Sequence, residues 1–114
     1  MFPSIRTGIE IIQRKRNIVM FVVSLTYVCE LSEIEKHLED HIEYLDENYA
    51  NGVFLASGRK EPRTGGVILA QMESRAELDK LIAKDPFKIN GLANYEVTEF
   101  IPSKTSEALS FLCA

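Results

Sequence analysis

The chain has 114 residues, of which 46% are hydrophobic and 26% are charged, so we expect one domain with a single core. No apolar run approaches the roughly 20 residues that a membrane-spanning helix requires. The formal net charge is −4, with +3 in residues 1–19 and −7 in the rest, which disfavours nucleic acids and anionic membranes as partners because both select clustered Lys and Arg.

Residues 1–19 contain no apolar segment followed by a small-residue cleavage site, so they do not resemble a secretory signal. We interpret them as an upstream extension, with Met20 as the true start, or alternatively as a short basic helix that packs on the domain or on a partner. Cys29 and Cys113 are the only cysteines. Without a secretory signal they predict free thiols in a reducing compartment, which indicates a cytoplasmic protein.

The first regular elements are a strand and a helix. Residues 17–28 read NIVMFVVSLTYV, and this enrichment in β-branched and aromatic residues predicts a buried strand. Ser32 and Glu35 match the S-x-x-E capping box, so a helix should begin at Ser32. Gly52 should end that helix, because glycine tolerates the left-handed conformation of a helix C-terminus.

Within this helix one histidine shares the apolar face. At 100° per residue His41 falls inside the arc of the apolar side chains, and His37 falls at its edge. The arc is formed by Ile34, Leu38, Ile42, Leu45 and Tyr49. We therefore expect His41 to point toward the sheet and to require a hydrogen-bond partner there.

The rest of the chain alternates short strands with one more helix. Ser74 and Glu77 form a second capping box, at which a second helix should begin. Pro86 should end that helix at about Lys84. The predicted elements are strands over 53–57 and 66–72 around a polar turn at 58–65, a helix to about 84, a strand over 94–101, and a short helix or tail over 103–114.

The order of elements is β-α-β-β-α-β. This order is typical of the ferredoxin-like α+β fold, an antiparallel sheet with two helices on one face. We expect that domain to occupy residues 20–102. Because the first strand is apolar on both faces, the helix-free face also needs cover, and a homodimer that packs sheet against sheet would supply it.

Two histidines and one aspartate are candidates for chemistry. His41 is either a satisfied core residue or a general acid or base. Asp85, before Pro86, either caps the turn that the proline forces or holds His41 in one tautomer, if the two helices lie side by side. His37 and His41 lack the H-E-x-x-H pattern of zinc proteases, because position 38 is Leu, and we expect no metal site.

The polar turn carries cations between glycines. Arg59, Lys60 and Arg63 are either a solvated turn or a clamp for a substrate carboxylate, to which Lys88 could add. The chain contains no dinucleotide fingerprint, P-loop or flavin-type glycine motif, so we expect an enzyme here to use side chains alone, without a cofactor.

Short motifs together resemble the YciI-like (YCII-related) family over residues 20–102. The motifs are His41-x-x-Tyr44-Leu45, Gly52, Ser57-Gly58, Gly65-Gly66, Asp85-Pro86-Phe87 and Gly91-Leu92. The resemblance implies a homodimer of the dimeric α/β-barrel type with an active site at His41 and Asp85. Tyr44, Ser57, Arg59 and Lys60 are the expected substrate-binding residues, although many members have Gly-Pro where this chain has Gly58-Arg59.

The resemblance leaves two classes of function open. In the first, a cofactor-independent lyase or isomerase transfers a proton on a small anionic or phenolic molecule, with His41 as acid or base and Asp85 as its orienting partner. A few relatives of this family eliminate chloride from chlorinated hydroquinone-type aromatics. In the second, a non-catalytic binding or accessory module uses the His41–Asp85 hydrogen bond only for structure.

Overall fold

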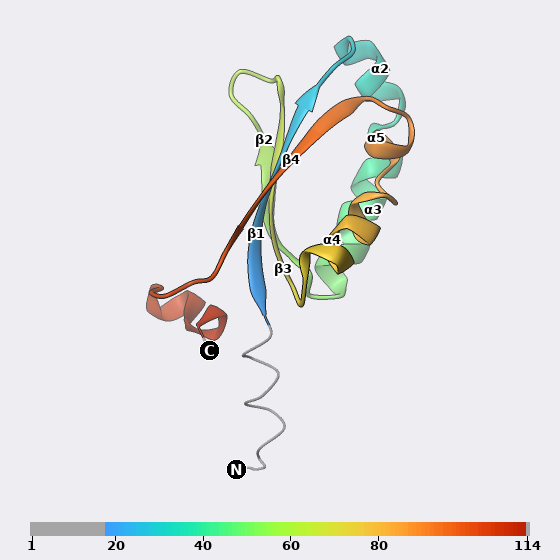
Figure 1. The fold of residues 1–114 in the computed structure, drawn as a ribbon. Helices are drawn as coiled ribbons and strands as arrows, with labels where there is room; N and C mark the ends of the chain where they lie inside the picture. The colour runs from blue at the N-terminus through green and yellow to red at the C-terminus, as the bar shows by residue number, and fades with distance from the viewer. Residues whose placement is uncertain (1–17, 114) are drawn as a thin grey trace.

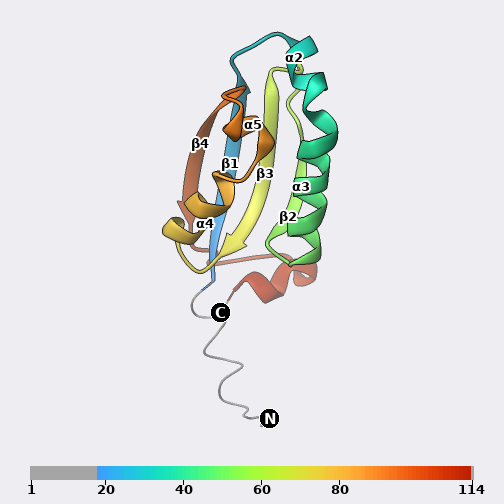
Figure 2. The same cartoon turned by 90° about the vertical axis from the view of Figure 1, so that its right-hand side faces the viewer.

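The computed structural model describes residues 18–113 as a four-stranded sheet with helices on one face (Figures 1 and 2). The strands lie in the order β2-β3-β1-β4 and every neighbouring pair is antiparallel. Their bounds are β1 Val19–Tyr27, β2 Phe54–Arg59, β3 Gly65–Met72 and β4 Ala93–Phe100, and the helices are α2 Leu31–Lys36, α3 Leu38–Ala50, α4 Arg75–Ile82 and α5 Pro86–Ile89. This arrangement confirms the predicted ferredoxin-like α+β fold.

Strand β1 is the centre of the sheet and of the core. It pairs with β3 on one side and β4 on the other. Alternate side chains of β1, namely Phe21, Val23 and Leu25, are buried in the core beneath the helices. Each such side chain contributes roughly 1.5–3 kcal/mol on burial, so this strand anchors the helical layer.

The first helix differs from its prediction at both its start and its middle. It begins at Leu31 after Glu30, and no side chain caps it, so the Ser32–Glu35 capping box is wrong. Because Ser32 lies inside the first turn, its hydroxyl is not at the cap position. The helix is also interrupted at His37, whose φ of −112° and ψ of 7° leave the helical region and separate α2 from α3.

The buried stripe of α3 is centred on polar residues. His41 is buried as predicted, together with Tyr44 and Asn48, whereas Ile42 and Tyr49 are exposed and their predicted burial is wrong. The inward rotation is possible because the buried polar groups find partners. The Tyr44 hydroxyl donates to the Leu81 carbonyl at 2.9 Å, and Asn48 Nδ2 donates to the Tyr44 carbonyl at 2.8 Å.

The β2–β3 hairpin has longer strands than predicted. Strand β2 continues to Arg59, so the predicted turn at 58–65 shrinks to residues 60–64 between the strands. As a result, Gly58 and Arg59 belong to the strand that was predicted to end at Ser57. At the start of β3, any Cβ on Gly65 would overlap the carbonyl oxygen of Leu25, so the close approach of β3 to β1 requires glycine there.

The second helical segment confirms one cap and corrects one ending. Ser74 accepts a hydrogen bond from the Glu77 backbone N–H, as its capping box predicts. Helix α4 ends at Ile82, before the predicted Lys84. Pro86 does not merely stop a helix: it begins α5, at the first helical position where its missing N–H costs nothing.

The last element of the described chain is one more short helix. Residues 107–112 form a 3₁₀ helix, η1 Glu107–Leu112, below the helix-free side of the sheet, within the segment predicted as a short helix or tail (Figure 1). The predicted extension over residues 1–19 lies, up to residue 17, outside the described residues. Across residues 18–113, no helix combines the length and apolar character needed to cross a membrane.

The two serines of the capping boxes provide a test of the fold. We expect Ser74→Ala to lower the free energy of unfolding by about 1 kcal/mol, because it removes the cap hydrogen bond of α4. Ser32→Ala is the matched control and should change it by less than about 0.5 kcal/mol. Urea denaturation measures both, and an equal loss in the two variants would contradict the observed start of α2.

Candidate functional site

The site is built on a buried pair that joins two helices distant in sequence. His41 comes from the middle of α3, and Asp85 is the residue that caps α5. His41 Nδ1 lies 2.7 Å from Asp85 Oδ1. The two residues are 8% and 0% exposed, so the predicted juxtaposition of these helices and of this pair is present.

Asp85 accepts three hydrogen bonds. Its Oδ1 accepts from the Phe87 backbone N–H at 3.0 Å as well as from His41, and its Oδ2 accepts from the Tyr95 hydroxyl at 2.6 Å. Burial, followed by the nearby charge of Asp85, raises the pKa of the Tyr95 hydroxyl, which therefore remains a donor. Three donors suit an ionised carboxylate, which can only accept.

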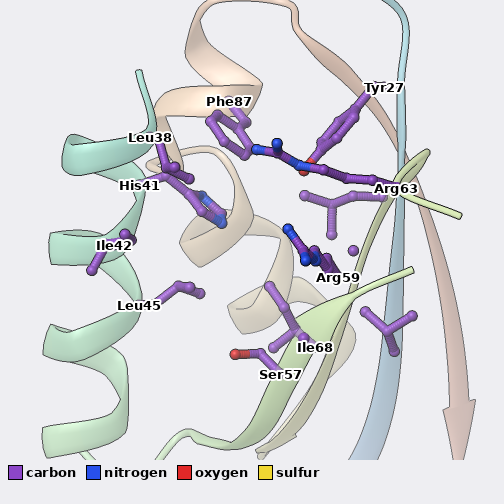
Figure 3. Close-up of a pocket in the computed structure, with 15 residues that line it drawn as sticks. Tyr27, Leu38, His41, Ile42, Leu45, Ser57, Arg59, Arg63, Ile68 and Phe87 are labelled. Atoms are coloured by element: carbon purple, nitrogen blue, oxygen red, sulfur yellow. The ribbon is translucent and has the colours of Figure 1, made fainter. Parts of the chain in front are cut away.

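The His41 ring is held in place from its face as well as from its edge. The Phe87 ring stacks on it with centroids 3.9 Å apart and an interplanar angle of 5°. Because Nδ1 binds Asp85, Nε2 is the ring nitrogen left for a ligand. The ring projects from α3 into the adjoining cavity (Figure 3).

The cavity lies between α3 and the sheet and has a volume of about 240 Å³. An apolar cavity of ~150 Å³ holds benzene, so this space fits one substituted ring or a molecule of similar size. Its walls are mostly apolar, and its polar groups are few. The apolar lining comes from Leu25, Tyr27, Leu38, Ile42, Leu45, Val67, Ile68 and Phe87.

Two arginines reach into the cavity from the β2–β3 hairpin (Figure 3). Arg59 lies at the end of β2 and is exposed, whereas Arg63 lies in the loop and is half-buried. Arg63 Nη1 is 3.5 Å from Glu35 Oε2 of α2, which joins the hairpin to the helical layer. The arginines supply positive charge opposite His41.

Of the other predicted binding residues, Ser57 lines the cavity, whereas Tyr44 and Lys60 do not. Ser57 lines the cavity, and its hydroxyl lies 2.5 Å from that of Tyr49. Tyr44 is not among the lining residues, because its hydroxyl is bound to the Leu81 carbonyl. Lys60 points away and donates to Thr26 Oγ1 at 3.1 Å.

Lys88, the further cation suggested for the anion clamp, has a different contact. Its Nζ lies 5.3 Å from the centroid of the Tyr95 ring, a cation–π distance. His37, at the kink, lies with Nδ1 3.4 Å from Asn90 Nδ2. Among residues 18–113, no three His, Cys, Asp or Glu side chains gather as metal ligands would.

The sequence reasoning missed Tyr95 and Phe87 as parts of the site. Alternation along the last strand does place Tyr95 and Val97 on the helix side of the sheet, and both pack against the core. The alternation predicts which face of the sheet Tyr95 occupies, but not that its hydroxyl binds Asp85. Phe87 was recognised only as part of a motif, and its stacking on His41 depends on the turn at Pro86.

Comparisons with known proteins agree with this architecture. No curated protein matches the chain. One similar solved structure is 5-chloro-2-hydroxyhydroquinone dehydrochlorinase (TftG) from Burkholderia phenoliruptrix AC1100, in complex with 2,5-dihydroxybenzoquinone, at 20% identity and a TM-score of 0.64, covering 71% of this chain and 92% of that one. Another is SnoaB, a cofactor-independent oxygenase from Streptomyces nogalater, at 17% identity and a TM-score of 0.49, covering 80% and 98%.

The likeness to TftG, at 20% identity, concerns the fold alone. Family membership is shown by the sequence. The family model of the YCII-related domain matches residues 20–101, which include His41, Asp85 and both arginines. The chain therefore belongs to the YCII-related domain family.

Proposed function

We propose that this protein is a cofactor-independent enzyme that transfers a proton on a small anionic or phenolic molecule, as a lyase or an isomerase does. The observation that carries the proposal is the buried His41–Asp85 hydrogen bond of 2.7 Å beside a cavity that His41 itself lines. A histidine held by a carboxylate in this way is suited to general acid–base catalysis.

The chemistry follows from the fixed tautomer. With Nδ1–H donated to Asp85, the lone pair of Nε2 takes a proton from a C–H or O–H of the bound molecule. The imidazolium so formed is stabilised by Asp85. It then returns the proton to another atom of the molecule, for an isomerase, or to a leaving group, for a lyase. Such a positioned base contributes about 10²- to 10⁴-fold in rate.

The substrate class rests on the lining of the cavity. Apolar walls of about one ring's size favour a compact cyclic molecule, and Arg59 and Arg63 favour an anionic group on it. Ser57 adds a hydroxyl on the same strand as Arg59. We leave Tyr44 and Lys60 out of the proposed binding set, because neither of them lines the cavity. The hydroxyquinone bound to TftG motivates phenols as the first test compounds.

A non-catalytic binding module is the second candidate. It is favoured by the number of partners that Asp85 already has: besides His41, the carboxylate caps α5 through the Phe87 N–H and accepts from Tyr95. A residue with this many structural bonds would be needed even without chemistry. In that case His41 binds a ligand or only completes the network.

Variants of His41 separate these candidates. We expect small carboxylates, lactones or substituted phenols to raise the melting temperature of the wild type, since they bind the folded state. A ligand found in this way is then assayed for turnover. His41→Ala should lower kcat by about 10²-fold or more, because the base is lost.

His41→Gln is the matched variant, since it keeps a hydrogen-bonding group but cannot act as a base at neutral pH. Preserved binding with lost turnover in His41→Gln supports the enzyme. Turnover in His41→Gln equal to that of the wild type contradicts His41 as the base, whereas a wild type that binds the ligand without turnover leaves the binding module. Melting curves without ligand verify that each variant is folded.

The cations of the hairpin give an independent prediction. We expect Arg59→Ala and Arg63→Ala each to weaken binding of an anionic ligand by about tenfold, the loss of a charge-assisted hydrogen bond. Lys60→Ala removes a neighbouring cation whose Nζ is bound to Thr26, and should change the affinity by less than about twofold. Calorimetric titration measures all three, and equal effects would contradict a specific arginine site.

We also propose a homodimer that packs sheet against sheet in the cytoplasm, where Cys29 and Cys113 remain the thiols that they are in the structure. The helix-free face carries apolar side chains, including Val22, Leu69 and the 42%-exposed Phe100.

Phe100→Glu tests this interface. We expect the wild type to be a dimer by size-exclusion chromatography with light scattering, and Phe100→Glu to be a monomer, because a charge there cannot be buried. Ile89→Glu alters an equally apolar, 66%-exposed residue on α5, and should remain dimeric. A monomeric wild type at micromolar concentration would rule this interface out.

A further inference from the structure

Tyr95 contacts the catalytic pair without reaching the cavity. It lies on β4, its ring packs against the core, and it is absent from the residues that line the cavity. Its hydroxyl donates to Asp85 Oδ2 at 2.6 Å, the carboxylate oxygen that His41 does not use. The reaction proposed above assigns Tyr95 no role.

We propose that Tyr95 is a positioning residue that fixes the tautomer of His41 through Asp85, and so keeps Nε2 as the basic atom. This inference rests on the proposed function of the same site. It concerns the protonation pattern of a chain of three side chains, Tyr95 to Asp85 to His41, rather than the substrate.

The Tyr95 hydroxyl is the proton donor at one end of this chain. Burial, and then the charge of Asp85, raise the pKa of that hydroxyl, so it keeps its proton. Because this hydroxyl donates to Asp85 Oδ2, that oxygen acts as an acceptor and is best suited to the bond when it carries no proton. Tyr95 thereby uses Asp85 Oδ2 as a hydrogen-bond acceptor.

The hydrogen bond between Asp85 and His41 has a direction that follows from the carboxylate. A carboxylate can only accept, so the short contact between Asp85 Oδ1 and His41 Nδ1 must be donated by Nδ1. If the pair took up a proton from solvent onto Asp85, the carboxyl group could instead donate to Nδ1, and the single proton of the neutral ring would then lie on Nε2. That tautomer has no lone pair facing the cavity.

Deletion of the Tyr95 hydroxyl would leave Asp85 Oδ2 without its hydrogen-bond donor. Asp85 is fully buried, so without Tyr95 its Oδ2 has no water to replace the lost donor. Asp85 then lacks one of its three hydrogen-bond donors, and the direction of its bond to His41 Nδ1 is less firmly fixed. Lys88 above the Tyr95 ring cannot substitute, because its ammonium contacts the face of the ring.

Nitrogen-15 NMR of the histidine rings tests this inference. The measurement is made well above the ordinary histidine pKa of about 6.5, where a free imidazole is neutral. We expect wild-type His41 to give a pyrrole-type Nδ1 and a pyridine-type Nε2. In Tyr95→Phe both shifts should move toward each other as the second tautomer becomes populated. His37, the other histidine of the chain, is an internal reference.

Tyr44→Phe is the matched control. It also deletes the hydroxyl of a buried tyrosine, but that hydroxyl donates to the Leu81 carbonyl and not to Asp85. Both variants should lose stability to a similar degree, and only Tyr95→Phe should change the His41 shifts. Equal shift changes in the two would assign the effect to loosened packing and overturn the inference.

Turnover adds a readout that separates this inference from the proposed function. Because Tyr95 does not line the cavity, Tyr95→Phe should lower kcat by about tenfold, the worth of one hydrogen bond to a charged group, with little change in KM. An altered tautomer in Tyr95→Phe with no turnover by the wild type would refute the enzyme and retain the positioning role. A wild-type tautomer in Tyr95→Phe would refute the positioning role and retain His41 as the base.

The wild-type protein offers a second measurement that needs no variant. The Tyr95 hydroxyl proton lies in a short bond to a buried carboxylate, so it should exchange slowly with water and be visible by proton NMR. A hydroxyl proton that exchanges as fast as that of an exposed tyrosine would overturn the inference directly.

Discussion

A fully buried carboxylate is the constraint on which this structure depends. An isolated charge at the position of Asp85 would be very costly, and only hydrogen bonds from the protein can offset that cost. The fold provides them from three elements: His41 from α3, the backbone of Phe87 from α5 and the hydroxyl of Tyr95 from β4. Asp85 thus ties both helical segments to one strand of the sheet, and the same bonds orient the imidazole beside the cavity.

Much of this could be predicted from the sequence, because the signals are local. The order of elements follows from patterning and turn residues, and His41 faces inward because it shares the helical period of its apolar neighbours. Asp85 precedes a proline, and its capping role needs only that context. The Ser74 cap is equally local, since donor and acceptor are three residues apart.

The remaining features depend on tertiary contacts. The break at His37 and the exposure of Ile42 depart from the helical period of the sequence. Tyr44 is buried and its hydroxyl is bound by a carbonyl of α4. Lys60 follows Arg59 in the chain, but successive side chains of an extended segment face opposite sides, so only Arg59 reaches the cavity. The bond between Tyr95 and Asp85 joins residues ten apart through a turn that no residue pattern specifies.

The structural and catalytic interpretations of His41 share one set of contacts. Asp85 caps α5 and orients the imidazole with the same oxygen, so the fold needs this carboxylate whether or not the protein has a reaction. A loss of stability on removing either partner therefore does not distinguish the two. The two interpretations are distinguished by Nε2, the ring nitrogen that does not bind Asp85. A purely structural histidine has no need for a free Nε2 beside a cavity that carries two arginines. The position of the proton on the His41 ring, rather than the presence of the pair, is the property that chemistry would require.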